Sequence, residues 1–108
     1  MKMKFEDLDV WKRSARLCSD IYLELKGLKD FSFKDQITRA SLSISSNIAE
    51  GFERESQKEC LNFLSYAKGS CGEVRSQIYV GIEIAYIERE KGNQWIQEAR
   101  GIFLFMLF

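Results

Sequence analysis

The stretch Asp35-Gln-Ile-Thr-Arg-Ala-Ser-Leu-Ser-Ile-Ser-Ser-Asn-Ile-Ala-Glu-Gly-Phe52 decides the fold of this chain. From Ala40 to Ala49 it contains no charged residue, only Ala, Ser, Leu, Ile and Asn. Apolar residues recur three and four positions apart, which is the spacing of one helix face. This apolar stripe consists of Phe33, Ile37, Ala40, Ile44, Ile48 and Gly51. Because so little of the predicted helix suits water, we expect it to be covered on more than one side.

A stripe of polar residues runs beside the apolar one at the same spacing, and two polar residues of the following helix are expected to join it. We interpret the set as a buried network or subunit contact that sets helix register. Its members are Gln36, Arg39, Ser43, Asn47, Glu50, Arg54, Ser70 and Glu73. Within it we expect Arg39 to pair with Glu73 or with Glu50. A ligand site or a nucleic-acid site is the alternative interpretation of the same residues.

The composition is that of a helical protein without electrostatic bias. The chain has 108 residues, no proline and seven glycines, which suits long uninterrupted helices in one domain spanning 1–108. Its 16 basic and 16 acidic residues cancel, so net charge provides no general attraction to nucleic acid or membranes. The N-terminus lacks the apolar segment of a signal peptide, and no apolar run reaches the ~20 residues of a membrane span. We therefore expect a cytoplasmic protein with no membrane partner.

Cysteine and histidine usage argues against several kinds of active site. The chain has no histidine, and its three cysteines, Cys18, Cys60 and Cys71, form no C-x-x-C pair. This removes most zinc-site patterns and catalysis by Ser-His or Cys-His pairs. We interpret the cysteines as small buried hydrophobes, and we predict no catalytic residue, no metal site and no cofactor.

Four helical segments with short connections predict an all-α, antiparallel, up-down-up-down four-helix bundle whose last helix is short. The segments are expected at about 8–26, 33–54, 57–88 and 94–107. We predict that side chains cap the starts of the helices and that a glycine ends the first one. These capping residues are Asp7, Ser32, Ser56 and Asn93, with Gly27 as the helix-ending glycine.

Apolar residues three and four positions apart predict the core faces of the helices. The face of the first helix is Leu8, Trp11, Ala15, Cys18, Tyr22 and Leu25, widened by Leu17 and Ile21. We interpret its two aromatic residues, Trp11 and Tyr22, as core rather than as a stacking platform. The face of the third helix is Cys60, Leu64, Ala67, Cys71, Val74, Ile78, Ile82 and Ala85. The face of the fourth helix is Trp95, Ile96, Ala99, Ile102, Phe103 and Met106.

Three glycines, Gly69, Gly72 and Gly81, lie inside the third predicted helix, where each costs about 1 kcal/mol relative to alanine. These costs suggest that another helix or subunit approaches the backbone closely. Gly69-Ser-Cys-Gly72 could also be a phosphate-binding turn. We favour the packing interpretation, because no strand precedes the segment and it lacks the Gly-Lys-Ser/Thr ending of such turns.

A set of motifs resembles one known family. Asp35-Gln-x-x-Arg-Ala-x-x-Ser-Ile-x-x-Asn-Ile-Ala-Glu-Gly51 is preceded by Phe5-x-x-Leu8-x-Val-Trp11-Lys12 and followed by Arg54-x-Ser56, Glu59-x-x-x-Phe63-Leu64, Ala67-x-Gly-Ser70 and Glu73. Over residues 5 to about 88 this pattern is similar to the four-helix-bundle family of 23S rRNA intervening-sequence proteins. The resemblance implies an antiparallel bundle that assembles as a ring-shaped homopentamer. A related branch is the accessory protein of diversity-generating retroelements, which works with a reverse transcriptase and nucleic acid.

Three function classes are open on these observations. The first is a non-enzymatic oligomeric assembly factor that associates with RNA through basic residues in and after the first helix, namely Lys12, Arg13, Arg16, Lys26 and Lys29. The second is a structural interaction or adaptor module that holds a protein partner through the apolar end at 101–108. The third is an enzyme with Glu50 and Glu73 as paired carboxylates. We disfavour the enzyme because no histidine, metal pattern or nucleophile supports it.

Overall fold

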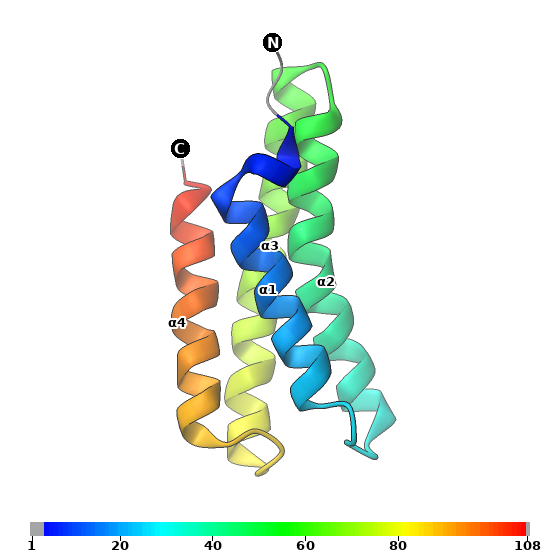
Figure 1. The fold of residues 1–108 in the computed structure, drawn as a ribbon, viewed down its shortest axis with the longest axis vertical. Coiled ribbons are helices and arrows are strands. Elements are labelled where there is room, and N and C mark those ends of the chain that lie inside the picture. The colour runs from blue at the N-terminus through cyan, green and yellow to red at the C-terminus, as the bar shows by residue number, and fades with distance from the viewer. Residues whose placement is uncertain (1–3, 108) are drawn as a thin grey trace.

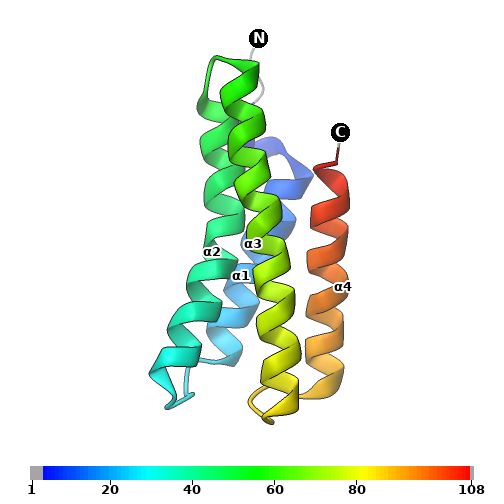
Figure 2. The same ribbon diagram turned by 180° about the vertical axis from the view of Figure 1, so that it is seen from behind.

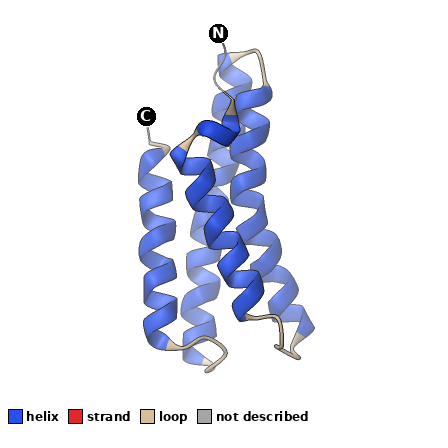
Figure 3. Cartoon of the chain, in the orientation of Figure 1, coloured by secondary structure: helices blue, strands red, loops and turns tan. Residues whose placement is uncertain are grey.

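The computed structural model describes residues 4–107, and in this range the chain folds into an antiparallel bundle of four α-helices without strands (Figure 1, Figure 3). A 3-10 turn, η1 (Phe5–Asp7), precedes the helices, which are α1 (Asp9–Glu24), α2 (Phe31–Glu53), α3 (Gln57–Glu83) and α4 (Arg89–Phe105). The described part of the chain measures 46 × 22 × 20 Å. The predicted four-helix bundle is confirmed, with α4 shorter than α2 and α3.

The four helices form a square in which α1 and α3 occupy opposite corners. Helix α1 packs against α2 and α4, and α3 packs against the same two helices, whereas the backbones of α1 and α3 do not approach each other closely. Figure 1 therefore shows α1 in front of α3, and Figure 2 shows α3 from the other side. The turn between α2 and α3 extends beyond the start of α1 and the end of α4. The α1–α2 and α3–α4 connections lie together at the opposite end.

The core explains how α2 can be rich in serine and still be enclosed. Ile37, Ile44 and Ile48 are fully buried between α1 and α3, so the expected coverage on more than one side is confirmed. The buried hydroxyls of α2 donate to carbonyls of their own helix, from Ser41 to Thr38 at 2.9 Å and from Ser45 to Leu42 at 3.1 Å. These bonds satisfy groups that would otherwise be costly to bury. Small polar side chains therefore do not need a solvated face.

The predicted boundary between the third and fourth helices is wrong. Helix α3 ends at Glu83 rather than at 88, because Ala85 adopts a left-handed backbone conformation with φ 65°. The amides of residues 86 and 87 both donate to the carbonyl of Gly81, which closes the end of the helix. Helix α4 then starts at Arg89 instead of 94. Asn93 therefore lies inside α4 and does not cap it.

Two other predicted caps are also wrong, and one is confirmed. Leu8 occupies the position before α1, so Asp7 does not cap it. Helix α2 is capped by Asp30, which accepts from the amide of Phe33 at 3.1 Å, and not by Ser32. Helix α1 ends before Gly27, and no glycine in residues 4–107 has a positive φ. The Ser56 cap is confirmed, since its hydroxyl accepts from the amide of Glu59 at 3.3 Å.

The predicted core face of α1 is confirmed in part, and its centre is shifted toward Leu17 and Ile21. The buried residues are Val10, Ser14, Leu17, Cys18 and Ile21, with Leu25 just after the helix. Trp11 is only half-buried, and Tyr22 is 45% exposed, so the expectation that Tyr22 is a core residue is wrong. The predicted faces of α3 and α4 are largely confirmed, because their central members from Ala67 to Ile78 and from Trp95 to Ile102 are buried.

Candidate functional site

Three members of the polar stripe are joined by hydrogen bonds between α2 and α3. The Ser70 hydroxyl donates to that of Ser43 at 2.9 Å. The Asn47 amide donates to the hydroxyl of Ser43 at 2.9 Å and to its carbonyl at 2.8 Å. Ser70 is buried, and the other two are half-buried. This small network links α2 to α3 and fixes their register at one level of the bundle.

The charged members of the stripe do not join this network. Arg39 pairs with Asp35 of its own helix at 3.0 Å, and both side chains are exposed, so the expected pair with Glu73 or Glu50 does not form. Glu50 pairs instead with Arg54 at 3.3 Å, and Arg54 also lies over the ring of Phe63. Gln36 and Glu73 are exposed. The exposed residues of this stripe contact solvent in the isolated chain, so only its centre is buried.

The basic residues predicted to contact RNA lie on α1 and in the connection that follows it. Lys12 and Arg16 are exposed on α1, and the exposed Lys26 continues their spacing of three and four residues in the turn just after the helix. We call this set the α1 outer row, and its members are Lys12, Arg16, Ser19, Leu23 and Lys26. Lys29 is exposed in the turn that follows. These side chains reach solvent without any rearrangement of the bundle.

Arg13, the fifth predicted RNA contact, is used inside the bundle. Its guanidinium donates two hydrogen bonds to the carboxylate of Glu98 on α4, at 2.9 and 3.1 Å. This contact lowers the pKa of Glu98 and raises that of Arg13. Gly101 makes room for the guanidinium, because a Cβ there would meet the Arg13 side chain. Arg13 therefore connects α1 to α4 and is not part of the α1 outer row.

The outward side of α3 has a different character. We call its central set the α3 outer row, which is Asn62, Ser65, Gly69, Gly72, Ser76 and Val80. It contains no charge, and all its members are exposed except the half-buried Gly72. A Cβ added at Gly69 or Gly72 would meet no atom within 4 Å outside the local helix. The close approach predicted for the three glycines is therefore found within the chain only at Gly81, which faces Ile87 and Phe33.

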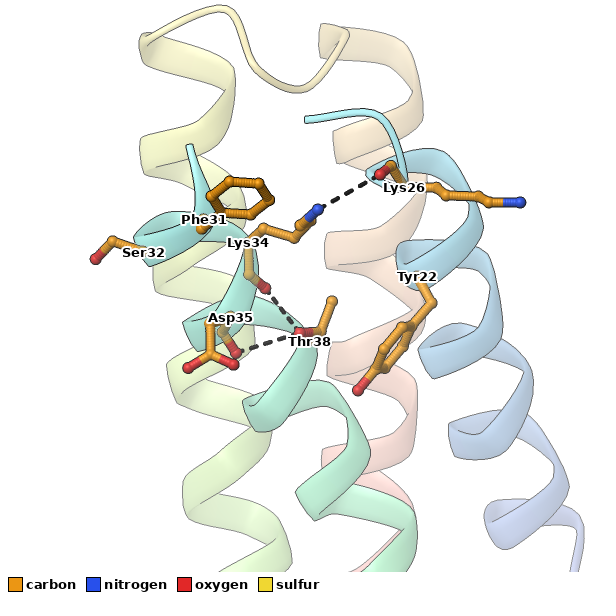
Figure 4. A pocket seen from close by; sticks show the side chains of 7 residues that line it. All are labelled: Tyr22, Lys26, Phe31, Ser32, Lys34, Asp35 and Thr38. Carbon is orange, nitrogen blue, oxygen red and sulfur yellow. Dashed lines mark hydrogen bonds between the residues drawn. The ribbon is translucent and has the colours of Figure 1, made fainter. Parts of the chain in front are cut away.

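A hollow of about 660 Å³ opens between the end of α1 and the start of α2 (Figure 4). We call it the α1–α2 hollow, and its lining is Tyr22, Lys26, Phe31, Ser32, Lys34, Asp35 and Thr38. The ammonium of Lys34 lies 4.7 Å from the centre of the Phe31 ring. Sequence reasoning missed this hollow because its parts come from two helices whose relative position depends on the turn. The only signal in the sequence was that two aromatic residues, Tyr22 and Phe31, lie close along the chain to Lys26 and Lys34.

The described residues provide little for catalysis. Among residues 4–107, no group of three or more Cys, Asp or Glu is arranged to hold a metal ion. Glu50 and Glu73 are both exposed, and the first is already paired with Arg54. Burial raises the pKa of the Cys71 thiol to about 12, which leaves it protonated and unreactive near neutral pH. Nothing in this part of the chain indicates enzyme activity.

Comparisons with known proteins point to one family. The family profile described as 23S rRNA-intervening sequence protein matches residues 6–105. A solved structure, of a protein with unknown function from the S23 ribosomal protein family of Bacteroides thetaiotaomicron, is similar in fold, with a TM-score of 0.85 and 25% sequence identity. The alignment covers 91% of this chain and 94% of that one. No curated protein matches the sequence. No helix among the described residues is long and apolar enough to cross a membrane.

Proposed function

This chain belongs to the family of 23S rRNA-intervening sequence proteins, and from that premise we propose that it is a non-enzymatic, self-associating bundle that works with RNA in the cytoplasm. The observation that carries the proposal is the α3 outer row. It combines exposure with a complete lack of charge among its members over about five helical turns. Such a surface is expected to be covered by another chain.

The two open glycines indicate how a second copy would be seated. Each glycine inside a helix costs about 1 kcal/mol relative to alanine, and at Gly69 and Gly72 the fold of one chain requires no such residue. A helix of a neighbouring copy could approach the backbone there, as small residues allow at close helix contacts. Exposed Leu61, Tyr66 and Tyr79 on the flanks of the row would add apolar area. The family resemblance implies a pentamer as the assembled state.

Self-association would also raise the affinity for RNA. One chain has no net charge, and its α1 outer row presents three basic side chains. Since α1 lies diagonally opposite α3, association through α3 leaves this row free. Repetition around a ring multiplies the contacts to phosphate, and avidity then exceeds the affinity of one copy.

The test is the mass of the protein in solution by light scattering, compared with the 12.6 kDa of one chain. We expect a defined multiple of this mass for the wild type and a monomer for Gly69→Arg. The variant places a long charged side chain in space that is open within the chain, so the bundle itself should fold normally. Arg16→Glu on α1 is the matched control and should keep the mass of the wild type. A monomeric wild type at tens of micromolar would refute the proposal.

A second candidate function is supported by the end of α4. Leu104, Phe105 and Leu107 are each more than half exposed, which is unusual for neighbouring large apolar side chains. They favour an adaptor that holds a protein partner without nucleic acid. The double variant Leu104→Ser, Phe105→Ser tests this candidate, because it should remove partner binding and leave the assembly mass unchanged. Binding of RNA by the wild type would contradict this candidate and favour the first.

A further inference from the structure

We propose that the α1–α2 hollow binds one unpaired nucleotide of an RNA strand, with the base against the aromatic side chains and a phosphate on Lys34. This inference rests on the proposed association with RNA and identifies where a single strand would be held. The lining of the hollow includes no member of the α3 outer row and no member of the hydrogen-bonded set Ser43, Asn47 and Ser70. Neither the family description nor the similar structure assigns it a role.

The aromatic side chains are exposed in a way that the bundle does not need. Tyr22 is 45% exposed and Phe31 is 70% exposed, and both lie on the lining of the hollow. In Figure 4 the two rings come from different helices, with the Lys34 side chain between them. Flat exposed rings beside a cation are the usual surface for an unstacked base, because every base presents a π face.

The polar groups match a phosphate and the edge of a base. The ammonium of Lys34 donates to the carbonyl of Lys26 at 3.4 Å, a long bond that a phosphate oxygen could replace with a stronger one. The hydroxyls of Tyr22 and Ser32 make no hydrogen bond to the described residues, so they are available to a ligand. The one carboxylate on the lining, Asp35, is paired with Arg39 at 3.0 Å, which offsets its charge.

The position of the hollow favours a strand over a free nucleotide. Lys26 is both the last member of the α1 outer row and part of the hollow lining. From Lys12 to Leu23 the row extends about 17 Å at ~1.5 Å per residue, and Lys26 continues it in the turn, so the row spans several phosphates of a single strand. A strand that follows the row therefore arrives at the two rings. The volume of about 660 Å³ lies within the roughly 300–1,000 Å³ of small-ligand sites.

The experiment is a calorimetric titration of the full chain with three probes: a ten-nucleotide single-stranded RNA, an RNA duplex of the same length, and AMP. We expect Tyr22→Ala and Phe31→Ala each to weaken single-strand binding about tenfold, as expected for the loss of one stacked base. Duplex binding should not change, since a duplex offers no unpaired base. Lys34→Gln should weaken single-strand binding and reduce its salt dependence.

The matched controls lie outside both the α1 outer row and the hollow. Leu42→Ala removes an apolar side chain of α2 that is about as exposed as Tyr22, and Lys58→Ala removes an exposed lysine at the start of α3. Single-strand binding that is insensitive to Phe31 and Tyr22, or equally sensitive to Leu42, overturns the proposed site and leaves the RNA function standing. If no RNA binds, the proposed RNA function fails. AMP binding that Phe31→Ala abolishes would then preserve the hollow as a nucleotide site, whereas no AMP binding overturns both.

Discussion

The outward sides of α1 and α3 lie at opposite corners of the same bundle and differ in almost every property that matters at a surface. The α1 outer row contains Lys12, Arg16 and Lys26, and it contains no glycine. The α3 outer row contains no charge, and two of its six members are glycines. Both rows are predominantly exposed and have the same helical spacing. Burial and helical spacing therefore do not account for the difference, and the proposed roles of the two sides would account for it.

This contrast corresponds to the two requirements of the proposed function, which are attraction of RNA phosphates and close approach of a second copy. A charged row on a solvated helix can attract phosphates and remains compatible with water. A row of small uncharged residues contributes little in water but allows another backbone to come close. Because α1 and α3 lie diagonally across the bundle, a contact on the outward side of one does not obstruct the outward side of the other. A bundle of 108 residues can in this way assemble through one side and bind through the opposite one.

The largest expected effect tests whether α1 is the side that meets RNA. Replacing Lys12, Arg16 and Lys26 together with Gln should weaken RNA binding by more than tenfold at 0.1 M salt. The slope of log affinity against log salt should fall by about two, since each lost phosphate contact on a single strand contributes ~0.7. Filter binding over a range of salt concentrations measures both quantities.

The matched control for this prediction is Lys58→Gln, which removes an exposed lysine at the start of α3. It should leave both the affinity and the slope nearly unchanged. If the Lys58 variant loses as much as one third of the effect of the triple variant, the contrast between the two sides fails. RNA contacts would then be distributed over the whole surface.

A smaller effect compares glycines that face the interior with glycines that face outward. At Gly81 a Cβ would lie 2.5 Å from Cδ1 of Ile87 and 3.0 Å from Cζ of Phe33, so Gly81→Ala should lower the free energy of unfolding by about 1–2 kcal/mol. Gly69→Ala has open space and should raise the free energy by up to about 1 kcal/mol. Urea unfolding at concentrations where the chain is monomeric measures both. A loss at Gly69 equal to that at Gly81 would show that the α3 outer row is not open.

The parts of this structure that could be predicted from the sequence are those with a local signal. Ser56-Gln-Lys-Glu59 is a strong helix start, and Val74 and Ile78 belong to a long regular face, so the existence and order of the helices followed. The end of α3 could not be predicted. The run Ile84-Ala-Tyr-Ile87 continues the apolar pattern, and an alanine with positive φ leaves no mark in the sequence.

The candidate sites were less predictable because each depends on which partner a side chain selects. We predicted that Arg39 pairs with Glu73 or Glu50. It pairs instead with Asp35, one turn earlier on the same helix, because this contact needs no particular packing between helices. Tyr22 fitted a three-four spacing, but the neighbouring Leu17 and Ile21 fitted an overlapping one and form the actual core. The α1–α2 hollow exists only once two helix ends are brought together.

The smallest expected effect is on the free energy of unfolding and concerns Arg13. We predicted that Arg13 contacts RNA, whereas its side chain binds Glu98 of α4. The pKa of Glu98 is lowered in the folded state by its hydrogen bonds to Arg13, so this pair stabilises the fold above the ordinary carboxyl pKa of about 4.5 and loses its effect as the pH falls below it. Because both side chains are partly exposed, we expect the pair to contribute less than about 1 kcal/mol to the free energy of unfolding.

Urea unfolding of the wild type and of Glu98→Gln measures this contribution. The two free energies of unfolding should differ at pH 7 and converge near pH 3. A difference in the free energy of unfolding between wild type and Glu98→Gln that is the same at both pH values would mean that the ion pair does not hold Arg13. Arg13 would then be available for RNA contact, together with the other basic residues of α1.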